Sequence, residues 1–256
     1  MDLHLKDRVF IVTGGTRGLG RATAEELVAG GANVVLSGRR QEQLDDAVTA
    51  LCEVDGRDCA LGVLADNADA TTPGRLVSAA QDHWGRLDGA LISVGGPPAG
   101  PVTTMTDEQW TGAFESVFLG AVRLAREIGA ALGEDGAIAL VLSTSVKEPV
   151  ENLGISNGLR PGLAMVAKSL ADELGPRGVR VNGLLPGRIA TDRVAELDAA
   201  TGDAEAAHQR WSQRIPLRRY GAPAEFGRVA AFLLSSAASF VTGVMVPVDG
   251  GMTRAI

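Results

Sequence analysis

The sequence has few of the side chains that build disulfide scaffolds and metal centres. Its 256 residues include two cysteines, three histidines and one tyrosine, and aromatic residues make up only 4% of the chain. Two cysteines, Cys52 and Cys59, are too few for a disulfide framework and lack the spacing of metal ligands, and the histidines are scattered. We therefore expect no metal site, and we expect the reducing cytoplasm as the location of the protein.

Basic residues and long apolar segments are also scarce. Lysine and arginine total 24 against 31 acidic residues, a formal net charge of −7, and no basic block stands out. This balance argues against a nucleic-acid partner. No apolar run reaches the roughly 18 residues that a membrane span needs, and the start of the sequence, MDLHLKDRVF, lacks the basic-then-apolar order of a signal peptide. We therefore expect a small-molecule substrate, with no membrane or nucleic-acid partner.

What the sequence does have is a regular alternation of short apolar runs and helical patterns. The apolar runs predict strands at residues 8–13, 33–37, 59–65, 87–93, 137–143, 179–185 and 244–249. Strands without polar alternation, separated by helices, are typical of a parallel sheet covered on both faces. No linker-like segment divides the chain, so we predict one α/β domain over residues 1–256. Its fold is a Rossmann-like, doubly wound parallel sheet of about seven strands with helices on both faces, and ligands bind beyond the carboxyl ends of such strands.

Two segments leave alternatives open. The polar, alanine-rich stretch 190–213 interrupts the alternation, and it fits a mobile lid or an ordinary pair of surface helices equally well. Pro161 falls in a helical pattern, and a residue that precedes proline is biased away from the helical conformation. The helix therefore either kinks at Pro161 or begins there, in which case residues 154–160 form a loop.

A glycine-rich segment, TGGTRGLG (13–20), lies between the first predicted strand and the first predicted helix. Gly14, Gly18 and Gly20 carry no Cβ, so the backbone there can approach a pyrophosphate at the helix N-terminus. Free N–H groups and the helix dipole favour an anion at that place. The position between a strand and a helix predicts a dinucleotide-binding loop.

The end of the second strand distinguishes between the two nicotinamide cofactors. An NAD site usually has a carboxylate there for the ribose 2′-hydroxyl, whereas this sequence has Gly38 followed by Arg39 and Arg40. Guanidinium groups suit a 2′-phosphate, and Arg17 in the glycine-rich segment could add a third donor. We therefore predict NADP(H) as the cofactor. In the alternative, Arg39 and Arg40 only solvate a helix start, where a cation opposes the helix dipole.

Together these motifs resemble the short-chain dehydrogenase/reductase family over about residues 5–252. TGGTRGLG resembles the family's TGxxxGxG, RVNGLLPGRIAT (180–191) resembles its V-N-x-x-x-P-G-x-x-x-T segment, and residues 216–251 resemble its C-terminal signature. The resemblance, of the 3-oxoacyl-acyl-carrier-protein reductase type, implies an oxidoreductase that works as a homotetramer or homodimer. The cofactor-binding residues predicted from the motifs and the resemblance are Gly14, Thr16, Arg17, Gly18, Leu19, Gly20, Arg39, Arg40, Asp66, Asn67, Val94, Gly95, Arg160, Pro186, Gly187, Ile189 and Thr191.

The catalytic part departs from the family pattern. The family uses a serine, a tyrosine thirteen residues later, a lysine four residues beyond that, and an asparagine on the preceding helix. Aligned through the segment AKSLADEL, the serine is retained as Ser143, and Ser156 replaces the tyrosine. Arg160 replaces the lysine, and Val117 replaces the asparagine. The single tyrosine of the chain, Tyr220, lies in the C-terminal signature and cannot be realigned into this site.

These replacements change the chemistry that the site can perform. A serine hydroxyl is far less acidic than a tyrosine, so Ser156 is a poor general acid, and Arg160 keeps its charge but does not give up its proton. Arg160 could hold the cofactor ribose or a substrate carboxylate, or stabilise a developing oxyanion. Lys147, four residues after Ser143, could supply the missing proton; alternatively it is a loop lysine paired with an acidic neighbour. Ser143 either polarises the substrate carbonyl or only caps backbone groups at a strand end.

Three functions fit the sequence. The first is an NADP(H)-dependent oxidoreductase of the carbonyl reductase or dehydrogenase type. Its variant catalytic site consists of Ser143, Ser156, Arg160 and Lys147, and Lys147, water or the substrate supplies the proton. The second is a non-redox lyase- or cyclase-type enzyme on the same fold. The third is a catalytically silent NADP(H)-binding sensor or scaffold. The intact cofactor motifs favour the first.

Overall fold

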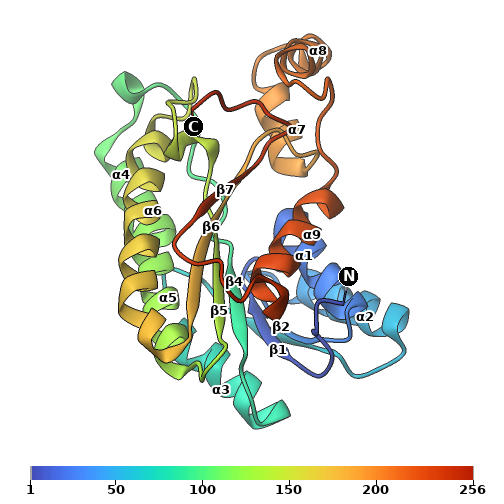
Figure 1. Cartoon of the computed structure of the whole chain (residues 1–256). Coiled ribbons are helices and arrows are strands. Elements are labelled where there is room, and N and C mark those ends of the chain that lie inside the picture. The colour runs from blue at the N-terminus through green and yellow to red at the C-terminus, as the bar shows by residue number, and fades with distance from the viewer. Residues whose placement is uncertain (1, 256) are drawn as a thin grey trace.

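The computed structural model describes residues 2–255, which form one seven-stranded sheet with helices on both faces (Figure 1). The order across the sheet is β3-β2-β1-β4-β5-β6-β7, and each neighbouring pair of strands is parallel. The predicted fold, a Rossmann-like α/β domain with a doubly wound parallel sheet, is confirmed. The strands are β1 (Val9–Val12), β2 (Asn33–Gly38), β3 (Ala60–Leu64), β4 (Gly89–Ile92), β5 (Ala137–Val141), β6 (Arg180–Pro186) and β7 (Met245–Val248).

Helices connect these strands throughout residues 2–255. The α-helices are α1 (Gly18–Ala29), α2 (Gln41–Asp55), α3 (Thr72–Trp84), α4 (Asp107–Ala113), α5 (Gly120–Ala131), α6 (Gly154–Leu174), α7 (Asp192–Ala199), α8 (Ala204–Arg214) and α9 (Pro223–Leu234). A π-helical turn, Phe114–Leu119, joins α4 to α5 and contains Val117. Among the helices of the described residues, none combines the length and the apolar character needed to cross a lipid bilayer.

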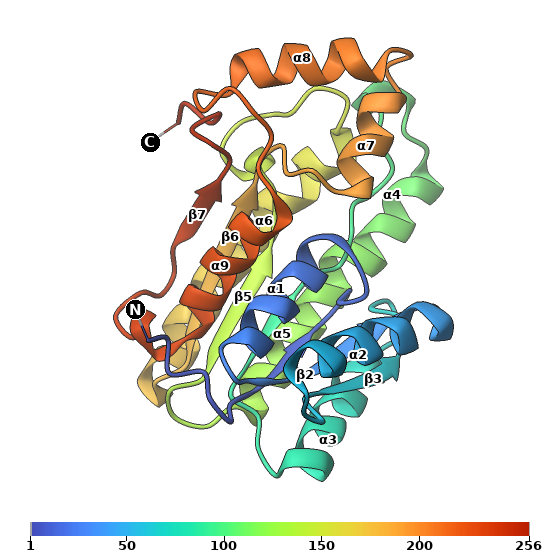
Figure 2. The same cartoon turned by 90° about the vertical axis from the view of Figure 1, so that its right-hand side faces the viewer.

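Each face of the sheet has its own helices and its own apolar core. α1, α2 and α9 pack on one face, where Leu27, Leu44 and Phe226 are fully buried. α3, α5 and α6 pack on the other face, where Leu76 and Leu124 are fully buried. Figures 1 and 2 show these two helical layers with the sheet between them. Because both faces are covered, the central strands are apolar throughout, which explains the uninterrupted apolar runs in the sequence.

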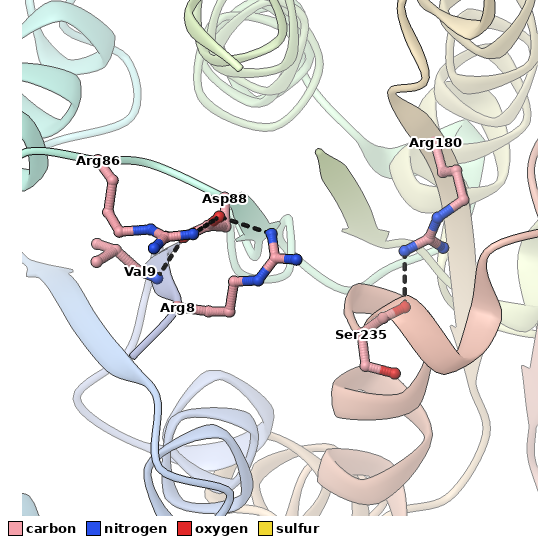
Figure 3. A network of polar contacts seen from close by, with 6 residues as sticks. All are labelled: Arg8, Val9, Arg86, Asp88, Arg180 and Ser235. Atoms are coloured by element: carbon pink, nitrogen blue, oxygen red, sulfur yellow. Dashed lines mark hydrogen bonds and ion pairs between the residues drawn. The ribbon is translucent and has the colours of Figure 1, made fainter. Parts of the chain in front are cut away.

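A buried carboxylate holds the amino-terminal ends of the central strands together (Figure 3). Asp88, just before β4, accepts a hydrogen bond from Arg8 at 2.8 Å and two from Arg86 at 2.8 and 2.9 Å. It also accepts one from the backbone N–H of Val9 at 2.8 Å. Burial by itself raises the pKa of Asp88, but the hydrogen bonds to it, led by those from Arg86, outweigh burial and lower the pKa overall. The cluster ties β4 to β1 at the edge opposite the carboxyl ends.

A buried arginine anchors α9 to the sheet. Arg180, the first residue of β6, donates hydrogen bonds to the carbonyls of Leu233 at 2.7 Å and of Ser235 at 2.8 Å; Figure 3 shows the contact with Ser235. Both carbonyls belong to the C-terminal end of α9, where helix carbonyls lack intrahelical partners and the helix dipole favours a cation. The polar residues of this edge therefore stabilise the fold, and the opposite edge is left for ligands.

The structure decides between the two alternatives for Pro161. α6 begins at Gly154 and continues through Pro161, so the alternative in which the helix begins at Pro161 is wrong. Contacts from outside the helix fix its first turn: the Asn157 side chain exchanges hydrogen bonds of 3.0 and 2.9 Å with the backbone of Val150. The backbone N–H of Gly154 also donates to the carbonyl of Gly100 at 2.9 Å. These tertiary contacts override the local bias of a residue that precedes proline.

Candidate active site

A large cavity opens at the carboxyl ends of β1 and β4, where the strand order reverses. Its volume is about 1460 Å³. A typical ligand pocket measures ~300–1,000 Å³, so the cavity has room for a nucleotide and a second small molecule. Every cofactor-binding residue predicted from the sequence lines it, in the segments that follow β1, β2, β3, β4 and β6 and on α6. That these residues contact a cofactor stays a prediction.

The glycine-rich segment forms a tight loop on one wall of the cavity. Gly14 and Gly18 have φ angles of 60° and 57°, in the left-handed region that favours glycine. A Cβ on Gly20 would clash with the carbonyl oxygen of Gly14. The residue that precedes α1, Arg17, makes no side-chain cap, so the first N–H groups of α1 are left without a side-chain partner. The loop thus offers backbone donors and close backbone approach to an anion.

The end of β2 offers guanidinium groups and no carboxylate. A Cβ on Gly38 would lie 2.7 Å from Cγ2 of Thr16, so this position has no room for a side chain unless Thr16 moves. Arg39 and Arg40 are exposed and line the cavity. Arg40 Nε donates to the side chain of Gln43 at 3.0 Å, within the same segment. This arrangement suits a phosphate group better than a ribose hydroxyl that seeks a carboxylate.

Ser143 lies at the carboxyl end of β5, half-buried at the cavity wall. Its Oγ accepts a hydrogen bond from the backbone N–H of Ser145 at 3.1 Å, at the start of a short 3-10 turn (Thr144–Val146). Its own hydroxyl proton has no acceptor among residues 2–255. Ser143 therefore presents a free O–H donor to a ligand in the cavity.

Ser156 is hydrogen-bonded to Ser145, a residue that the sequence analysis did not identify. Ser145 and Ser156 are 4% and 5% exposed, and their hydroxyl oxygens lie 3.1 Å apart. Ser145 Oγ also donates to the carbonyl of Ser156 at 3.4 Å. No spacing rule indicates this contact, because it depends on how the loop that follows the 3-10 turn folds back to the first turn of α6. The Ser156 hydroxyl is thus held by Ser145 at the edge of the cavity.

Arg160 brings an unpaired positive charge to the cavity wall. Its side chain is 5% exposed, and it donates from Nη1 to the carbonyl of Val141 at 2.7 Å and from Nη2 to that of Gly95 at 2.5 Å. Nε is buried without a partner, and no described carboxylate pairs with the guanidinium. Burial lowers the pKa of Arg160 to about 10, so the group is still charged at neutral pH. Arg160 ties β5 to the loop after β4 and provides a fixed cation in the cavity wall.

Comparison with known proteins decides the family. Residues 14–253 match a protein-family model described as enoyl-(acyl carrier protein) reductase. The chain is 34% identical over 272 residues to a cyclohexanol dehydrogenase of Rhodococcus sp. (strain TK6), covering 98% of each chain. It belongs to the short-chain dehydrogenase/reductase family.

Solved structures of short-chain dehydrogenases/reductases share the whole fold. A levodione reductase superimposes with a TM-score of 0.93 at 29% identity, over 98% of this chain and 99% of the other. An L-sorbose reductase from Gluconobacter frateurii, solved with NADPH and L-sorbose, superimposes with a TM-score of 0.92 at 29% identity over 100% of both chains. The relatives are oxidoreductases that act on small molecules, as the sequence motifs indicated.

The other predicted residues are placed as follows within this short-chain dehydrogenase/reductase fold. Lys147 is exposed after the 3-10 turn and is not among the residues that line the cavity. Val117 is buried and lines the cavity. Tyr220 lies outside the cavity lining, and its hydroxyl donates to Asp198 at 2.8 Å. With a single tyrosine in the chain, no tyrosine reaches this site.

The segment 190–213, predicted as a lid or a surface helix pair, forms α7 and α8. Figure 2 shows α8 across the top of the view, above the carboxyl ends of β6 and β7. Arg193 on α7 donates to the carbonyl of Pro97 at 2.7 Å. Arg17 lies 3.5 Å from Asp192, so the glycine-rich loop also contacts α7. The two helices therefore border the cavity, and their movement as a lid stays a prediction.

Proposed function

We propose that the protein is an NADP(H)-dependent oxidoreductase that interconverts a small carbonyl compound and its reduced form at Ser143. The observation that carries this proposal is the end of β2, where position 38 has no room for a carboxylate and Arg39 and Arg40 line the cavity. Structural relatives solved with NADPH support the choice of cofactor, among them the L-sorbose reductase and an actinorhodin polyketide ketoreductase.

The residues of the cavity fit the parts of this cofactor. The first N–H groups of α1 would hold the pyrophosphate, and Arg39, Arg40 and Arg17 would hold the 2′-phosphate. The positive charge of Arg160 at the cavity wall would attract the oxygen atoms of the nicotinamide ribose. When bound, the cofactor supplies or accepts a hydride.

Ser143 and Arg160 act on the substrate oxygen in two different ways, by a hydrogen bond and by a positive charge. Ser143 accepts a hydrogen bond from the Ser145 backbone, so its own O–H is free to donate to the substrate oxygen. The buried charge of Arg160 stabilises the negative charge that develops on that oxygen. Neither group releases a proton at neutral pH, and Lys147 is not part of the cavity lining. Water in the cavity or the substrate itself therefore supplies the proton in this proposal.

The test is NADPH consumption over a panel of ketones, imines and activated alkenes, with two matched serine variants. We expect Ser143→Ala to lower turnover by about 10²–10³-fold, because it removes a donor to the developing oxyanion. Ser156→Ala is expected to change turnover less than about tenfold, because Ser145 already engages that hydroxyl. Gly18→Asp is expected to abolish NADPH binding. No consumption with any compound, or equal losses in both serine variants, contradicts the proposal.

A second candidate is an NADP(H)-binding protein without turnover. The hydrogen bonds of the residues at the family's tyrosine and lysine positions favour it. Ser156 is already hydrogen-bonded to Ser145, and both Nη atoms of Arg160 already donate to backbone carbonyls. This candidate predicts tight NADPH binding, no consumption over the same panel, and no effect of Ser143→Ala on any measured property. The same assay therefore separates the two candidates.

We also propose that the protein is cytoplasmic and assembles as a homodimer or homotetramer. Met165 on α6 is 70% exposed, and Phe240 before β7 is fully exposed, which supports a subunit contact at one of these places. Light scattering coupled to gel filtration measures the mass in solution, and a monomer at micromolar concentration contradicts the assembly.

A further inference from the structure

Beyond Ser143, the cavity has a basic and aromatic wall near α8. Arg188 follows β6, Trp211 and Arg214 lie in the last turn of α8, and all three line the cavity. The guanidinium carbon of Arg188 lies 4.2 Å from the centroid of the Trp211 ring, and that of Arg214 lies 5.3 Å from the same ring. The indole attracts both cations, while the two cations repel each other.

Arg188 is held in place from outside the cavity. Its Nη1 donates to one oxygen of Asp198 at 2.7 Å, and the other oxygen of Asp198 accepts the hydroxyl of Tyr220 at 2.8 Å. Asp198 is 5% exposed and does not line the cavity. It therefore positions Arg188 without occupying the space in front of it. In residues 2–255, no acceptor other than Asp198 bonds to the Arg188 guanidinium, so further N–H donors are available to a ligand.

The positive charge at this end is incompletely neutralised. Arg214 pairs with no described carboxylate, and neither does Arg254, which also lines the cavity. Burial lowers the pKa of Arg188 even though Asp198 is beside it. A second anion at this place would stabilise the charged form of Arg188.

Carboxylates line other parts of the cavity. Glu196 lies 3.6 Å from Arg193, to which it is paired, and Glu148 and Glu151 belong to the loop between β5 and α6. Glu148 and Glu151 repel an anion from that loop, whereas the arginines attract it toward α8. With the 2′-phosphate of the proposed cofactor on Arg17, Arg39 and Arg40, a second anionic group that enters the cavity is therefore attracted to the Trp211 end.

We propose that this place is a substrate subsite for a carboxylate, bound by Arg188 and Arg214 beside Trp211. This proposal rests on the oxidoreductase function proposed above. The substrate is then an oxo acid or hydroxy acid, and the carbon that carries its oxo or hydroxyl group lies near Ser143. Arg188 supplies the pre-positioned fork that suits bidentate contact with a carboxylate, and Arg214 adds charge from an exposed position.

The experiment compares oxo acids of increasing chain length with their methyl esters, which keep the carbonyl and lose the charge. Binding to the NADPH-loaded protein is measured by isothermal titration, and NADPH consumption is measured separately. The variant is Arg214→Gln. The matched control is Arg126→Gln, on α5, which is exposed, lies outside the cavity lining and has the same charge change.

We expect at least one acid to bind about tenfold or more tightly than its ester, because a charge-assisted hydrogen bond typically contributes this much. Arg214→Gln is expected to remove most of that preference, and Arg126→Gln to retain it. No preference for any acid, no binding of any acid, or equal losses in both variants overturns the subsite. Acid preference without NADPH consumption refutes the oxidoreductase function and leaves the anion subsite. Consumption of neutral ketones without a preference for acids refutes the anion subsite and leaves the oxidoreductase function.

Discussion

Placing a carboxylate at the end of β2 tests how the cavity distinguishes its cofactor. Gly38→Asp introduces a Cβ that would lie 2.7 Å from Cγ2 of Thr16. Thr16 is β-branched and stiff, so the neighbouring backbone or Thr16 itself must shift. The double variant Thr16→Ser/Gly38→Asp removes that methyl group and keeps the hydroxyl, so it has the new carboxylate without the clash.

The two variants separate the steric effect from the electrostatic effect. Overpacking of this kind costs about 1–3 kcal/mol, and each kcal/mol lowers Tm by roughly 2–4 °C in a protein of this size. We expect Gly38→Asp to lower Tm accordingly and Thr16→Ser/Gly38→Asp to recover most of the loss. In both variants the carboxylate repels a 2′-phosphate by about 1–4 kcal/mol at contact distance. The affinity for NADPH is therefore expected to fall about tenfold or more, with no loss for NADH.

Thermal unfolding and fluorescence titration with NADPH and NADH measure the two effects. Equal Tm values for the single and double variants would refute the steric reasoning at Gly38. A double variant that still binds NADPH as tightly as the native protein would refute the assignment of the β2 end to the 2′-phosphate.

Two further predictions concern buried charges. Asp88→Asn is expected to lower the free energy of unfolding by about 2–3 kcal/mol near pH 7. The pKa of Asp88 is lower in the folded protein than in the unfolded chain. Its contribution is therefore present above about pH 4, the unfolded value, and is lost as pH falls through the native pKa. A difference in unfolding free energy between the native protein and Asp88→Asn that stays constant with pH, measured by urea unfolding, contradicts this. Arg160→Lys keeps the charge but cannot reach the carbonyls of both Val141 and Gly95, so we expect a loss of about 1–3 kcal/mol. An equally stable lysine variant in urea unfolding would show that the second contact contributes nothing.

Features set by short segments of sequence were predictable. The strands follow from apolar runs because a sheet covered on both faces needs apolar residues on both faces. The glycine-rich loop follows from local backbone requirements, which Gly14 and Gly18 meet with positive φ angles. The order of these elements also indicated where the cavity lies, because ligand sites in such sheets form at the carboxyl ends of the strands.

Contacts between the side chains of one element and a neighbouring element or loop were not predictable in the same way. The pairing of Ser145 with Ser156, and the two carbonyls that Arg160 reaches, depend on how α6 packs against β5 and the loop after β4. The start of α6 depends on Asn157 and its contacts with the preceding loop, which override the bias caused by the proline. Side-chain contacts between elements, rather than the conformational preferences of single residues, decide these features.

The sulfur atoms of Cys52 and Cys59 are a further example. They lie 3.8 Å apart, although the chain shows no disulfide pattern. The two residues meet because α2 ends beside the start of β3, and burial raises the pKa of the Cys59 thiol to about 12. A thiol held in its protonated form is a poor nucleophile, so this proximity does not indicate a catalytic role.

The central claim is that arginines at the end of β2 select NADP(H) for this cavity. It is tested most directly by the dissociation constants of NADPH and NADH for the native protein and for Arg39→Gln/Arg40→Gln. The account predicts that the native protein binds NADPH at least about tenfold more tightly than NADH, and that the double variant loses this preference. Equal affinities in the native protein, or an unchanged preference in the variant, would contradict it.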